Sequence, residues 1–308
     1  MTLLYYDPRF LEHDTGHHPE RPERLRQVIS HLEKTDVLAE CLRLQWQPAS
    51  RQRLQYVHEP GHIERVAAMA QRGGGFLDPD TVVSPASYDV ACLAAGATCD
   101  AVERVLAGEA NTALCLVRPP GHHALAERAM GFCLFNNIAV AACVARQELQ
   151  LDRVLIVDWD VHHGNGTQDT FYADGHVGFF SMHRWPFYPG TGAAEETGTG
   201  EGLGATRNLP VAFGTPREAY RDLFRRELED FAASIKPQLV LVSAGFDSHR
   251  DDPIGSLGLE VEDFAELTKN VRDVAAAYAA GRVVSLLEGG YNPPVLAQCV
   301  ETHLRGLM

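Results

Sequence analysis

Two aspartates and a histidine alternate near the middle of this chain, at Asp158, Asp160 and His162. Alternate residues of a strand leave the same face about 6.6 Å apart, so all three cannot reach one ion unless the chain turns. Buried carboxylates are costly unless something compensates them, and a divalent metal would do so. We therefore expect Asp160 and His162 to converge on a metal ion where a strand ends, and Asp158, one step deeper, to orient another group.

A simpler interpretation is that this segment only hydrogen-bonds the backbone of its own loop. A lone Asp-x-His favours that interpretation. The longer string D-W-D-V-H-H-G-N-G favours the metal, because it ends in a glycine-bounded loop directly after an apolar strand.

Three other segments with the character of buried strands, 113–117, 239–247 and 282–287, also end at polar residues. These polar residues are His122 and His123 after a Pro-Pro-Gly turn, Asp247, and Tyr291 after two glycines. Open parallel sheets place their sites at the carboxyl ends of the strands, where the four segments would meet. Asp247 then supplies a third metal ligand.

Together these residues contain the parts of a hydrolytic site. Two carboxylates and one histidine leave a coordination position for water, as in catalytic rather than structural zinc sites. His122 and His123 would supply acid and base, although a lone histidine there would more often be a satisfied polar group. The hydroxyl of Tyr291 can polarise a carbonyl as its oxygen becomes an oxyanion. The combination predicts metal-assisted hydrolysis of an amide.

Apolar runs and amphipathic segments alternate along the chain and predict an α/β fold with a central, mostly parallel sheet. Strands are expected at 3–6, 113–117, 154–157, 177–183, 239–247 and 282–287. Helices are expected at 22–32, 60–71, 88–106, 216–235 and 261–280, and from an asparagine cap within 131–137 to 149. Without an obvious linker or repeat, we expect one catalytic domain over residues 1–308.

Two glycine-rich loops receive different interpretations. Residues 73–75 are expected to be mobile, whereas 184–204 is too aromatic for a linker and is predicted to be a folded loop that lines a pocket. Three histidines lack acidic partners at strand ends and are expected to be loop and rim residues: His13, His17 and His18. Arg24, on the first turn of the next helix, is expected to point inward.

Composition narrows the classes of partner. The formal net charge of −14 argues against non-specific binding to nucleic acid or to an anionic membrane. Seven cysteines without tight paired spacing are typical of reduced core residues in a cytoplasmic protein. Neither a signal peptide nor a run of transmembrane length is visible.

Five strings carry a resemblance to a known family: R-P-P-G-H-H, G-F-C-L-F-N-N, D-W-D-V-H-H-G-N-G-T-Q, S-A-G-F-D and E-G-G-Y. They resemble the zinc-dependent histone deacetylase family, most closely its class II members and bacterial relatives, which include acetylpolyamine amidohydrolases. The resemblance implies the arginase/deacetylase fold and one catalytic zinc ion. It assigns the zinc to Asp160, His162 and Asp247, and catalysis to His122, His123, Tyr291, Asp158 and Asn165.

The same resemblance implies further contacts. The substrate would meet Gly131, Phe132 and Tyr188 in a tunnel. Separately from the resemblance, we expect substrate contacts at Asp80, Ile254, Gly289 and Gly290. A structural potassium ion would be held by Asp158, Asp160, His162, Ser181 and Met182, and a second by Phe171, Asp174 and Val177. Two positions depart from common patterns: Asn165 replaces the aspartate of class I members, and Tyr188 replaces the usual tunnel phenylalanine. Two interpretations of Asp80 have equal weight: it binds the substrate backbone at the tunnel mouth, or it is an ordinary loop or cap aspartate.

The expected reaction removes an acetyl or longer acyl group from an N-acylated amine and gives acetate and a free amine. Tyr291 and the metal would polarise the carbonyl, and His123, aided by His122, would take a proton from the attacking water. A histidine would then protonate the leaving amine. The expected partner is an acylated lysine peptide or a small acylated amine, and an oligomer is compatible with the sequence.

Three alternatives are weighed against this one. A two-manganese ureohydrolase would need a carboxylate where Gly164 stands, and an acyl-lysine reader would lack Tyr291 or the histidine pair. An acetylpolyamine deacetylase would be expected to carry an acidic residue at the rim, but Ile254 occupies the place of the glutamate found in some of them. No long insertion follows Gly75 either, and both features favour acyl-lysine.

Overall fold

Eight parallel strands form the central sheet of the protein, whose computed structural model describes residues 2–308. The strands lie in the order β2-β1-β5-β10-β9-β6-β7-β8, and neighbours pair in parallel throughout. Their bounds are β1 Thr2–Tyr5, β2 Cys41–Arg43, β5 Thr112–Cys115, β6 Val154–Asp158, β7 Val177–Arg184, β8 Thr206–Val211, β9 Leu239–Ala244 and β10 Val283–Leu287. The predicted α/β architecture is confirmed.

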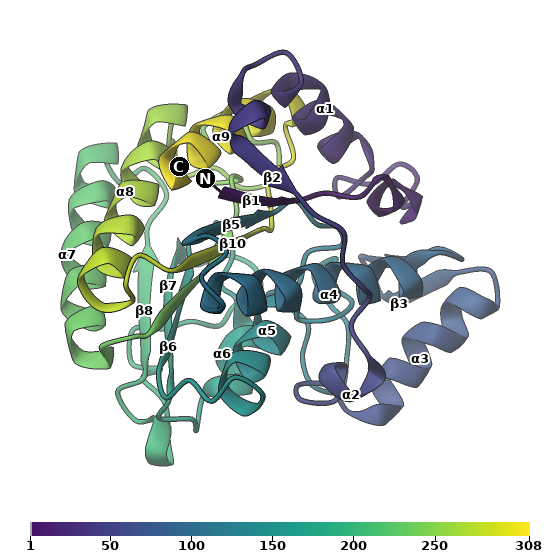
Figure 1. Ribbon diagram of the computed structural model, residues 1–308, viewed down its shortest axis with the longest axis horizontal. Coiled ribbons are helices and arrows are strands. Elements are labelled where there is room, and N and C mark those ends of the chain that lie inside the picture. Colours follow the sequence, from purple (N-terminus) through teal and green to yellow (C-terminus); the bar gives the residue numbers. More distant parts are fainter. Residues whose placement is uncertain (1) are drawn as a thin grey trace.

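Helices cover both faces of this sheet (Figure 1). On one face lie α1 (Glu23–Leu32), α7 (Arg217–Ile235), α8 (Val261–Tyr278) and α9 (Pro293–Leu307), and on the other α4 (Ser87–Leu106) packs against α5 (Asn137–Gln147). The remaining elements are α2 (Arg51–Leu54), α3 (Pro60–Gln71), α6 (Asn165–Phe171), the hairpin of β3 (Gly75–Asp78) and β4 (Thr81–Val83), and 3-10 turns at Pro8–Glu12, Val37–Glu40 and Gly200–Gly202. Parallel strands covered on both faces must be apolar on both, which explains their continuous apolar runs.

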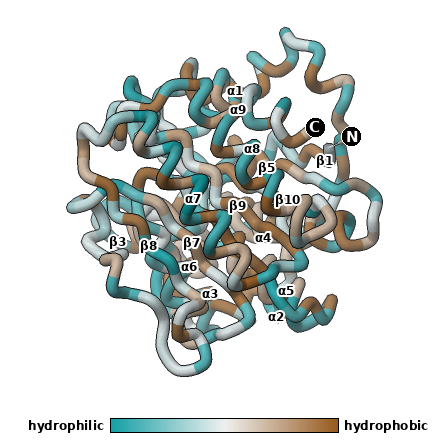
Figure 2. Tube along the Cα trace, turned by 90° about the vertical axis from the view of Figure 1, so that its left-hand side faces the viewer, coloured by the Kyte–Doolittle hydropathy of each residue, from teal (hydrophilic) through white to brown (hydrophobic). Residues whose placement is uncertain are grey.

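Burial holds the strands rigidly in place. Every residue of β6, β9 and β10 is buried. Figure 2 shows brown, apolar segments through β9 and β10 at the centre and more teal, polar chain along α7 on the outside. A sheet fixed in this way can hold side chains at its strand ends within narrow limits.

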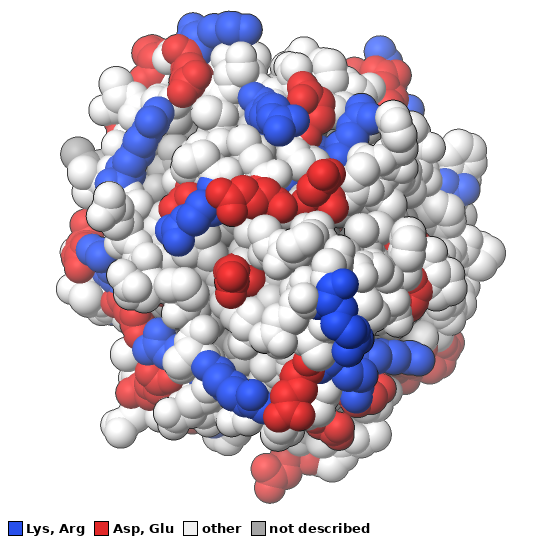
Figure 3. Space-filling view, turned by 90° about the vertical axis from the view of Figure 1, so that its right-hand side faces the viewer, with Lys and Arg blue, Asp and Glu red and all other residues white. Residues whose placement is uncertain are grey.

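The strand order explains why distant residues meet. The four central neighbours β5, β10, β9 and β6 are parallel, so their carboxyl ends share one edge of the sheet. β1 runs toward the right-hand side of Figure 1. That side of the molecule faces the viewer in Figure 3, where acidic and basic side chains are intermixed.

All six predicted strands and six predicted helices are present; α3 has the predicted ends, and the other elements differ by a few residues at one or both ends. Asn136 caps α5 as expected, because its side chain accepts a hydrogen bond from Ala139 N at 3.1 Å. The sequence motifs do not reveal the edge strands β2 and β8, the helices α2, α6 and α9, or the β3–β4 hairpin. Gly75 starts β3, so the expectation of a mobile loop over 73–75 is wrong at that residue: antiparallel pairing with Val83 holds it.

The burial of individual side chains confirms one predicted placement and corrects another. Arg24 is buried, as expected, but His13 is buried too, so its placement at the rim is wrong. Its Nδ1 lies 2.6 Å from Ser87 Oγ, a contact that sequence spacing cannot show. All seven cysteines are free. Among residues 2–308, no helix combines the length and the apolar character needed to cross a membrane.

Candidate metal centre and tunnel

Asp160, His162 and Asp247 meet at the carboxyl ends of β6 and β9. Each side chain offers one ligand atom, and the three atoms lie within 4.8 Å of one another. All three residues are buried. The convergence that the sequence predicts is therefore present, and the turn after β6 brings Asp160 and His162 together.

Backbone N–H groups orient both carboxylates. Asp160 accepts hydrogen bonds from His162 N at 2.9 Å and from Gly289 N at 2.8 Å. Asp247 Oδ1 accepts one from Val161 N at 2.9 Å. The other oxygen, Asp247 Oδ2, is buried and has no hydrogen-bond partner among residues 2–308; it lies 3.3 Å from His162 Nδ1.

Glycines keep this space open. A Cβ atom at Gly245 would collide with Asp160, and one at Gly289 would collide with both Asp160 and Asp247. Gly289 is the first residue of the Gly-Gly pair that precedes Tyr291. Glycine is required at this position because the backbone lies close to the carboxylates, and not because of an unusual backbone angle.

The electrostatics of the three residues call for a cation. Burial and the neighbouring Asp160 raise the pKa of Asp247 to about 7. Burial alone would lower the pKa of His162, but Asp160 and Asp247 outweigh it and raise that pKa to about 9. Both shifts reflect unbalanced negative charge in a dry site. An unpartnered buried carboxylate oxygen beside a second carboxylate and an imidazole fits a divalent metal ion.

His122 and His123 stand beside this site, with ring centroids 3.9 Å apart. His122 Nδ1 lies 3.0 Å from Asp158 Oδ2, and His123 Nδ1 lies 2.7 Å from Asn165 Oδ1. An amide oxygen can only accept, so Asn165 holds the proton of His123 on Nδ1 and leaves Nε2 free to accept another. Asp158 does orient another group, as its position in the strand predicts.

The two imidazoles differ in charge. Burial lowers the pKa of His122, but the carboxylates of Asp158 and Asp160 outweigh burial and raise it to about 10. Burial and the adjacent charge of His122 hold the pKa of His123 well below its usual range. At neutral pH the pair therefore consists of one imidazolium and one neutral imidazole.

Glu288 anchors the histidine loop, although no role is predicted for it from the E-G-G-Y string that it begins. Its buried carboxylate accepts hydrogen bonds from Gly121 N at 2.7 Å, His122 N at 3.3 Å and Ser243 Oγ at 3.2 Å. The signals in the sequence are its place in that string and its position directly after the apolar strand β10. A carboxylate in that place needs partners, and the backbone of the neighbouring loop supplies them.

Tyr291 lies at the end of the same strand segment. Its backbone N donates to Asp252 Oδ2 at 2.6 Å, and its ring meets Phe132 edge-on, with centroids 5.8 Å apart. Burial and the nearby Asp247 hold the pKa of the Tyr291 phenol well above its usual range. The hydroxyl therefore keeps its proton at neutral pH and can act as a donor.

A buried ion cluster supports this segment from behind. Arg24 donates to the carbonyl oxygens of Gly290, at 2.7 Å, and of Glu288, and its guanidinium lies 5.0 Å from the Tyr291 ring centroid. Arg24 also pairs with Glu20 at 3.1 Å, and Arg118 donates two hydrogen bonds to the same carboxylate. The inward direction of Arg24 is predicted from the sequence, but its partners are not.

A narrow cavity of about 170 Å³, here called the tunnel, leads to the metal centre. Its lining consists of Asp80, His123, Gly131, Phe132, His162, Phe187, Tyr188, Ile254 and Tyr291. Phe187 stacks on His162 with centroids 5.2 Å apart, and Tyr188 meets His123 edge-on at the same distance. The loop of residues 184–204 thus lines a pocket, as its aromatic content predicts.

The remaining predicted residues occupy other places. Gly289 and Gly290 contact the carboxylates and Arg24 through their backbones rather than lining the tunnel. Asp158 and Ser181 are register partners on β6 and β7, and Met182 follows. The second predicted potassium set lies around the start of β7: Phe171, Asp174 and Val177.

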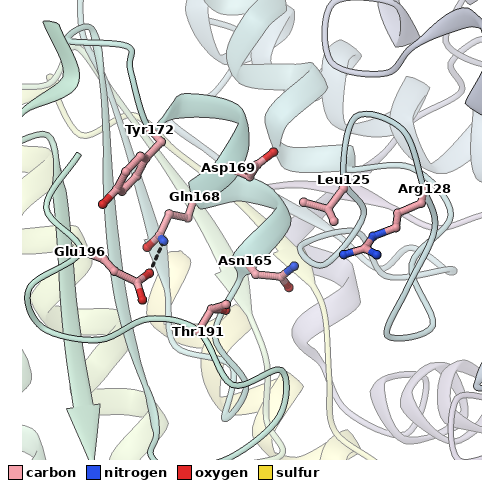
Figure 4. A pocket seen from close by; sticks show the side chains of 8 residues that line it. All are labelled: Leu125, Arg128, Asn165, Gln168, Asp169, Tyr172, Thr191 and Glu196. Carbon is pink, nitrogen blue, oxygen red and sulfur yellow. Dashed lines mark hydrogen bonds between the residues drawn. The ribbon is translucent and has the colours of Figure 1, made fainter. Parts of the chain in front are cut away.

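A second, more open cavity of about 450 Å³ lies on the outer side of Asn165 (Figure 4). Gln168 and Glu196 lie side by side in its wall, joined by a hydrogen bond of 2.6 Å. Gln168 also contacts His163 Nε2 at 3.0 Å, and His163 directly follows His162. This polar network ties the 184–204 loop to α6 and so supports the tunnel wall.

Comparisons with known proteins agree with this geometry. Residues 18–307 match the family model described as a histone deacetylase domain. The histone deacetylase-like amidohydrolase of Pseudomonas aeruginosa is 40% identical over 283 residues, which cover 92% of this chain and 74% of that protein. The polyamine deacetylase HDAC10 of Homo sapiens is 41% identical over 97% of this chain and 46% of its own length. The crystal structure of the HDA15 HD domain matches with a TM-score of 0.94 and 36% identity, over 100% of this chain and 89% of that one.

Proposed function

Because the chain belongs to the histone deacetylase family, we propose that it is a zinc-dependent deacetylase that hydrolyses the amide of an acylated lysine side chain. The products are a carboxylate, acetate in the simplest case, and the free amine. The observation that carries the proposal is a tunnel that ends at three residues able to hold a metal ion, beside two histidines and a tyrosine.

The donor set supports zinc as the metal. Asp160, His162 and Asp247 would hold it through two carboxylates and one imidazole, and this set leaves a position for water or substrate. A bound zinc ion supplies Lewis acidity toward the scissile carbonyl and the attacking water.

The chain's own residues then divide the proton work. His123 lines the tunnel and is neutral, so it takes a proton from the attacking water and returns it to the leaving amine. His122, paired with Asp158, stays charged behind it and stabilises the negative charge that develops. The Tyr291 hydroxyl donates to the carbonyl oxygen as that oxygen becomes an oxyanion.

The shape of the tunnel supports an acyl-lysine. Aromatic walls formed by Phe132, Phe187 and Tyr188 suit a slender aliphatic chain, and Ile254 makes part of the mouth apolar. A second candidate substrate is an acetylpolyamine, favoured by the similarity to a polyamine deacetylase and by Asp80 at the mouth.

We propose in addition that structural potassium ions are held as the family resemblance implies. The first would lie at Asp158, Asp160, His162, Ser181 and Met182, and the second at Phe171, Asp174 and Val177. The pairing of Asp158 with Ser181 across β6 and β7 supports the first set.

Purified protein, stripped with a chelator and reconstituted with zinc, tests the function. Matched acetyl-lysine peptides, longer acyl-lysine peptides and acetylpolyamines should be compared by kcat/KM. We expect activity to vanish on stripping, to return with zinc, and to be highest on an acyl-lysine peptide. Full turnover by metal-free protein would end the zinc proposal, and a preference for acetylpolyamine would replace the substrate.

A further inference from the structure

A groove that is separate from the cavity of Figure 4 opens beside the tunnel mouth. It encloses about 490 Å³ and shares Ile254 and Tyr291 with the tunnel. Its remaining lining comes from the loop before α1 and from the segment after β9: His17, His18, Pro19, Arg21 and Pro253. A substrate whose acyl-lysine enters the tunnel must place its neighbouring groups at this groove or at the opposite side of the mouth.

Arg21 is the permanent charge of this groove. Its two nearest arginine neighbours in the sequence are paired, Arg24 with Glu20 and Arg26 with Glu23. Arg21 is exposed and forms no salt bridge within residues 2–308, and no acidic side chain is among the residues lining the groove. An uncommitted guanidinium in a chain of net charge −14 stands out against its surroundings.

The groove is a built feature rather than a loose loop. His18 Nδ1 accepts a hydrogen bond from Glu20 N at 3.1 Å, so its Nε2 donates to the carbonyl oxygen of Asp80 at 3.1 Å. The His18 ring also meets Phe132 of the tunnel wall edge-on, with centroids 4.5 Å apart. Glu20, the residue before Arg21, is fully buried and therefore anchors the backbone from which Arg21 projects.

The tunnel and the groove contain side chains of opposite type. Asp80 lines the tunnel, where burial and Asp78 raise the pKa of its carboxyl group. Arg21 lines the groove. A second ammonium group of the substrate is therefore unfavourable on the Arg21 side, and a carboxylate is favourable there.

We propose that Arg21 forms a subsite for an anionic side chain, an aspartate or a glutamate next to the acyl-lysine of a peptide substrate. The inference rests on the proposed deacetylase function and makes its substrate class narrower. Neighbouring Cα atoms of a peptide are about 3.8 Å apart, so a residue beside the acyl-lysine stays close to the mouth and its side chain can extend into the groove. A guanidinium pairs well with a carboxylate because its planar donors match two oxygens.

Acetyl-lysine peptides that differ only at one flanking position, Glu, Gln or Lys, placed before or after the acyl-lysine, provide the test. For wild type we expect kcat/KM to be about threefold to fivefold higher for the Glu peptide than for the Lys peptide on one side, mainly through KM, the scale of an exposed ion pair. Arg21→Gln should abolish this preference and Arg21→Glu should reverse it. The preference should shrink as salt is added.

Arg226→Glu is the matched control, because Arg226 is 66% exposed on α7 and lines neither the tunnel nor the groove. It makes the same change in net charge and should leave the peptide preference unaltered. Equal preferences in wild type and Arg21→Glu, or an equal change in Arg226→Glu, would overturn the subsite while leaving the deacetylase assignment intact. Failure of wild type to act on any acyl-lysine peptide would instead overturn the proposed function and the subsite with it.

Discussion

The protein buries carboxylates in two neighbouring clusters and treats them in opposite ways. The glutamate cluster consists of Glu20, Arg24 and Arg118, and the metal cluster consists of Asp160, His162 and Asp247. In the glutamate cluster, two guanidinium groups outweigh the effect of burial and lower the pKa of Glu20 to about 2. In the metal cluster, burial and a second carboxylate raise the pKa of Asp247 to about 7, and one of its oxygens has no hydrogen-bond partner within residues 2–308.

The difference separates structural charge from functional charge. Removing a carboxylate that the protein satisfies with its own buried cations destabilises the fold, whereas a carboxylate left unsatisfied in a dry site marks a place where an external cation belongs. Arg24 links the two, because it binds Glu20 and also holds the backbone carbonyls of Glu288 and Gly290 just before Tyr291. The satisfied cluster thus positions part of the unsatisfied one.

Asp247→Asn should produce the largest loss of activity. The substitution keeps an oxygen for Val161 N but removes a charged ligand, so we expect most bound metal to disappear and turnover to fall by more than about a thousandfold. In metal-free protein the melting temperature should stay equal or rise, because the substitution relieves repulsion with Asp160. Metal analysis together with calorimetry checks both parts, and a retained metal content would show that another residue completes the site.

In contrast to Asp247→Asn, Glu20→Gln should affect the stability of the fold before it affects activity. It leaves two buried guanidinium groups without a counter-charge, so we expect the free energy of unfolding to fall by about 3 kcal/mol or more. Urea denaturation measures this. Glu23→Gln is the control, because its pair with Arg26 is exposed and should contribute at most about 1 kcal/mol.

The pH dependence of this loss has a definite sign. The pKa of Glu20 is lowered from 4.5 to about 2 in the folded protein, so its contribution is complete above pH 4.5 and is lost as the pH falls toward 2. The stability difference between wild type and Glu20→Gln should therefore shrink across that window. A difference that stays constant down to pH 2 would mean that Glu20 stabilises the fold by shape rather than by charge.

Tyr291→Phe should lower turnover by roughly a hundredfold or more, the usual cost of losing one oxyanion donor. The ring, with its contacts to Phe132 and Arg24, remains, so metal content and melting temperature should match wild type. Steady-state kinetics should show the loss in kcat more than in KM. Unchanged turnover would mean that something other than this hydroxyl polarises the carbonyl.

Much of the fold can be predicted from the sequence, for a physical reason. Central strands such as β6 and β9 are buried on both faces and are therefore short continuous apolar runs rich in β-branched residues, which favours a strand over a helix. The edge strands give no such signal: β2 is half exposed, and β8 contains Pro210, which only an edge tolerates. α9 begins with two prolines immediately after the Tyr291 segment, which conceals its start.

The candidate site also has residues that can be predicted from the sequence and residues that cannot. Asp160, His162 and Asp247 can be placed together because parallel strands bring their carboxyl ends to one edge. The supporting residues cannot, because their roles depend on partners distant in sequence: Glu288 binds the His122 loop, and Glu20 binds Arg118. His13 is mispredicted for that reason, since only the fold brings it to Ser87.

The smallest expected effect comes from placing a third carboxylate, neither buried nor metal-bound, at the tunnel mouth with Ile254→Glu. It would attract a second ammonium group of a substrate, so acetylpolyamine turnover should rise against acetyl-lysine peptide turnover by roughly fivefold, which needs about 1 kcal/mol. Ile254→Gln controls for shape. Arg21 lines the same groove and can pair with the new carboxylate, as Arg118 does with Glu20.

The double variant Ile254→Glu/Arg21→Gln therefore tests whether a carboxylate at the surface is satisfied by a neighbouring guanidinium, as Glu20 is in the interior. With the guanidinium removed, the new carboxylate is free for the substrate, and the rise in the kcat/KM ratio should exceed that of Ile254→Glu alone. If adding Arg21→Gln to Ile254→Glu leaves the kcat/KM ratio unchanged, the two side chains do not interact, and the groove is wider than the residues that it shares with the tunnel imply. If neither variant changes the ratio and wild type already prefers the polyamine, the acyl-lysine assignment is wrong, while the metal chemistry of Asp160, His162 and Asp247 would stand.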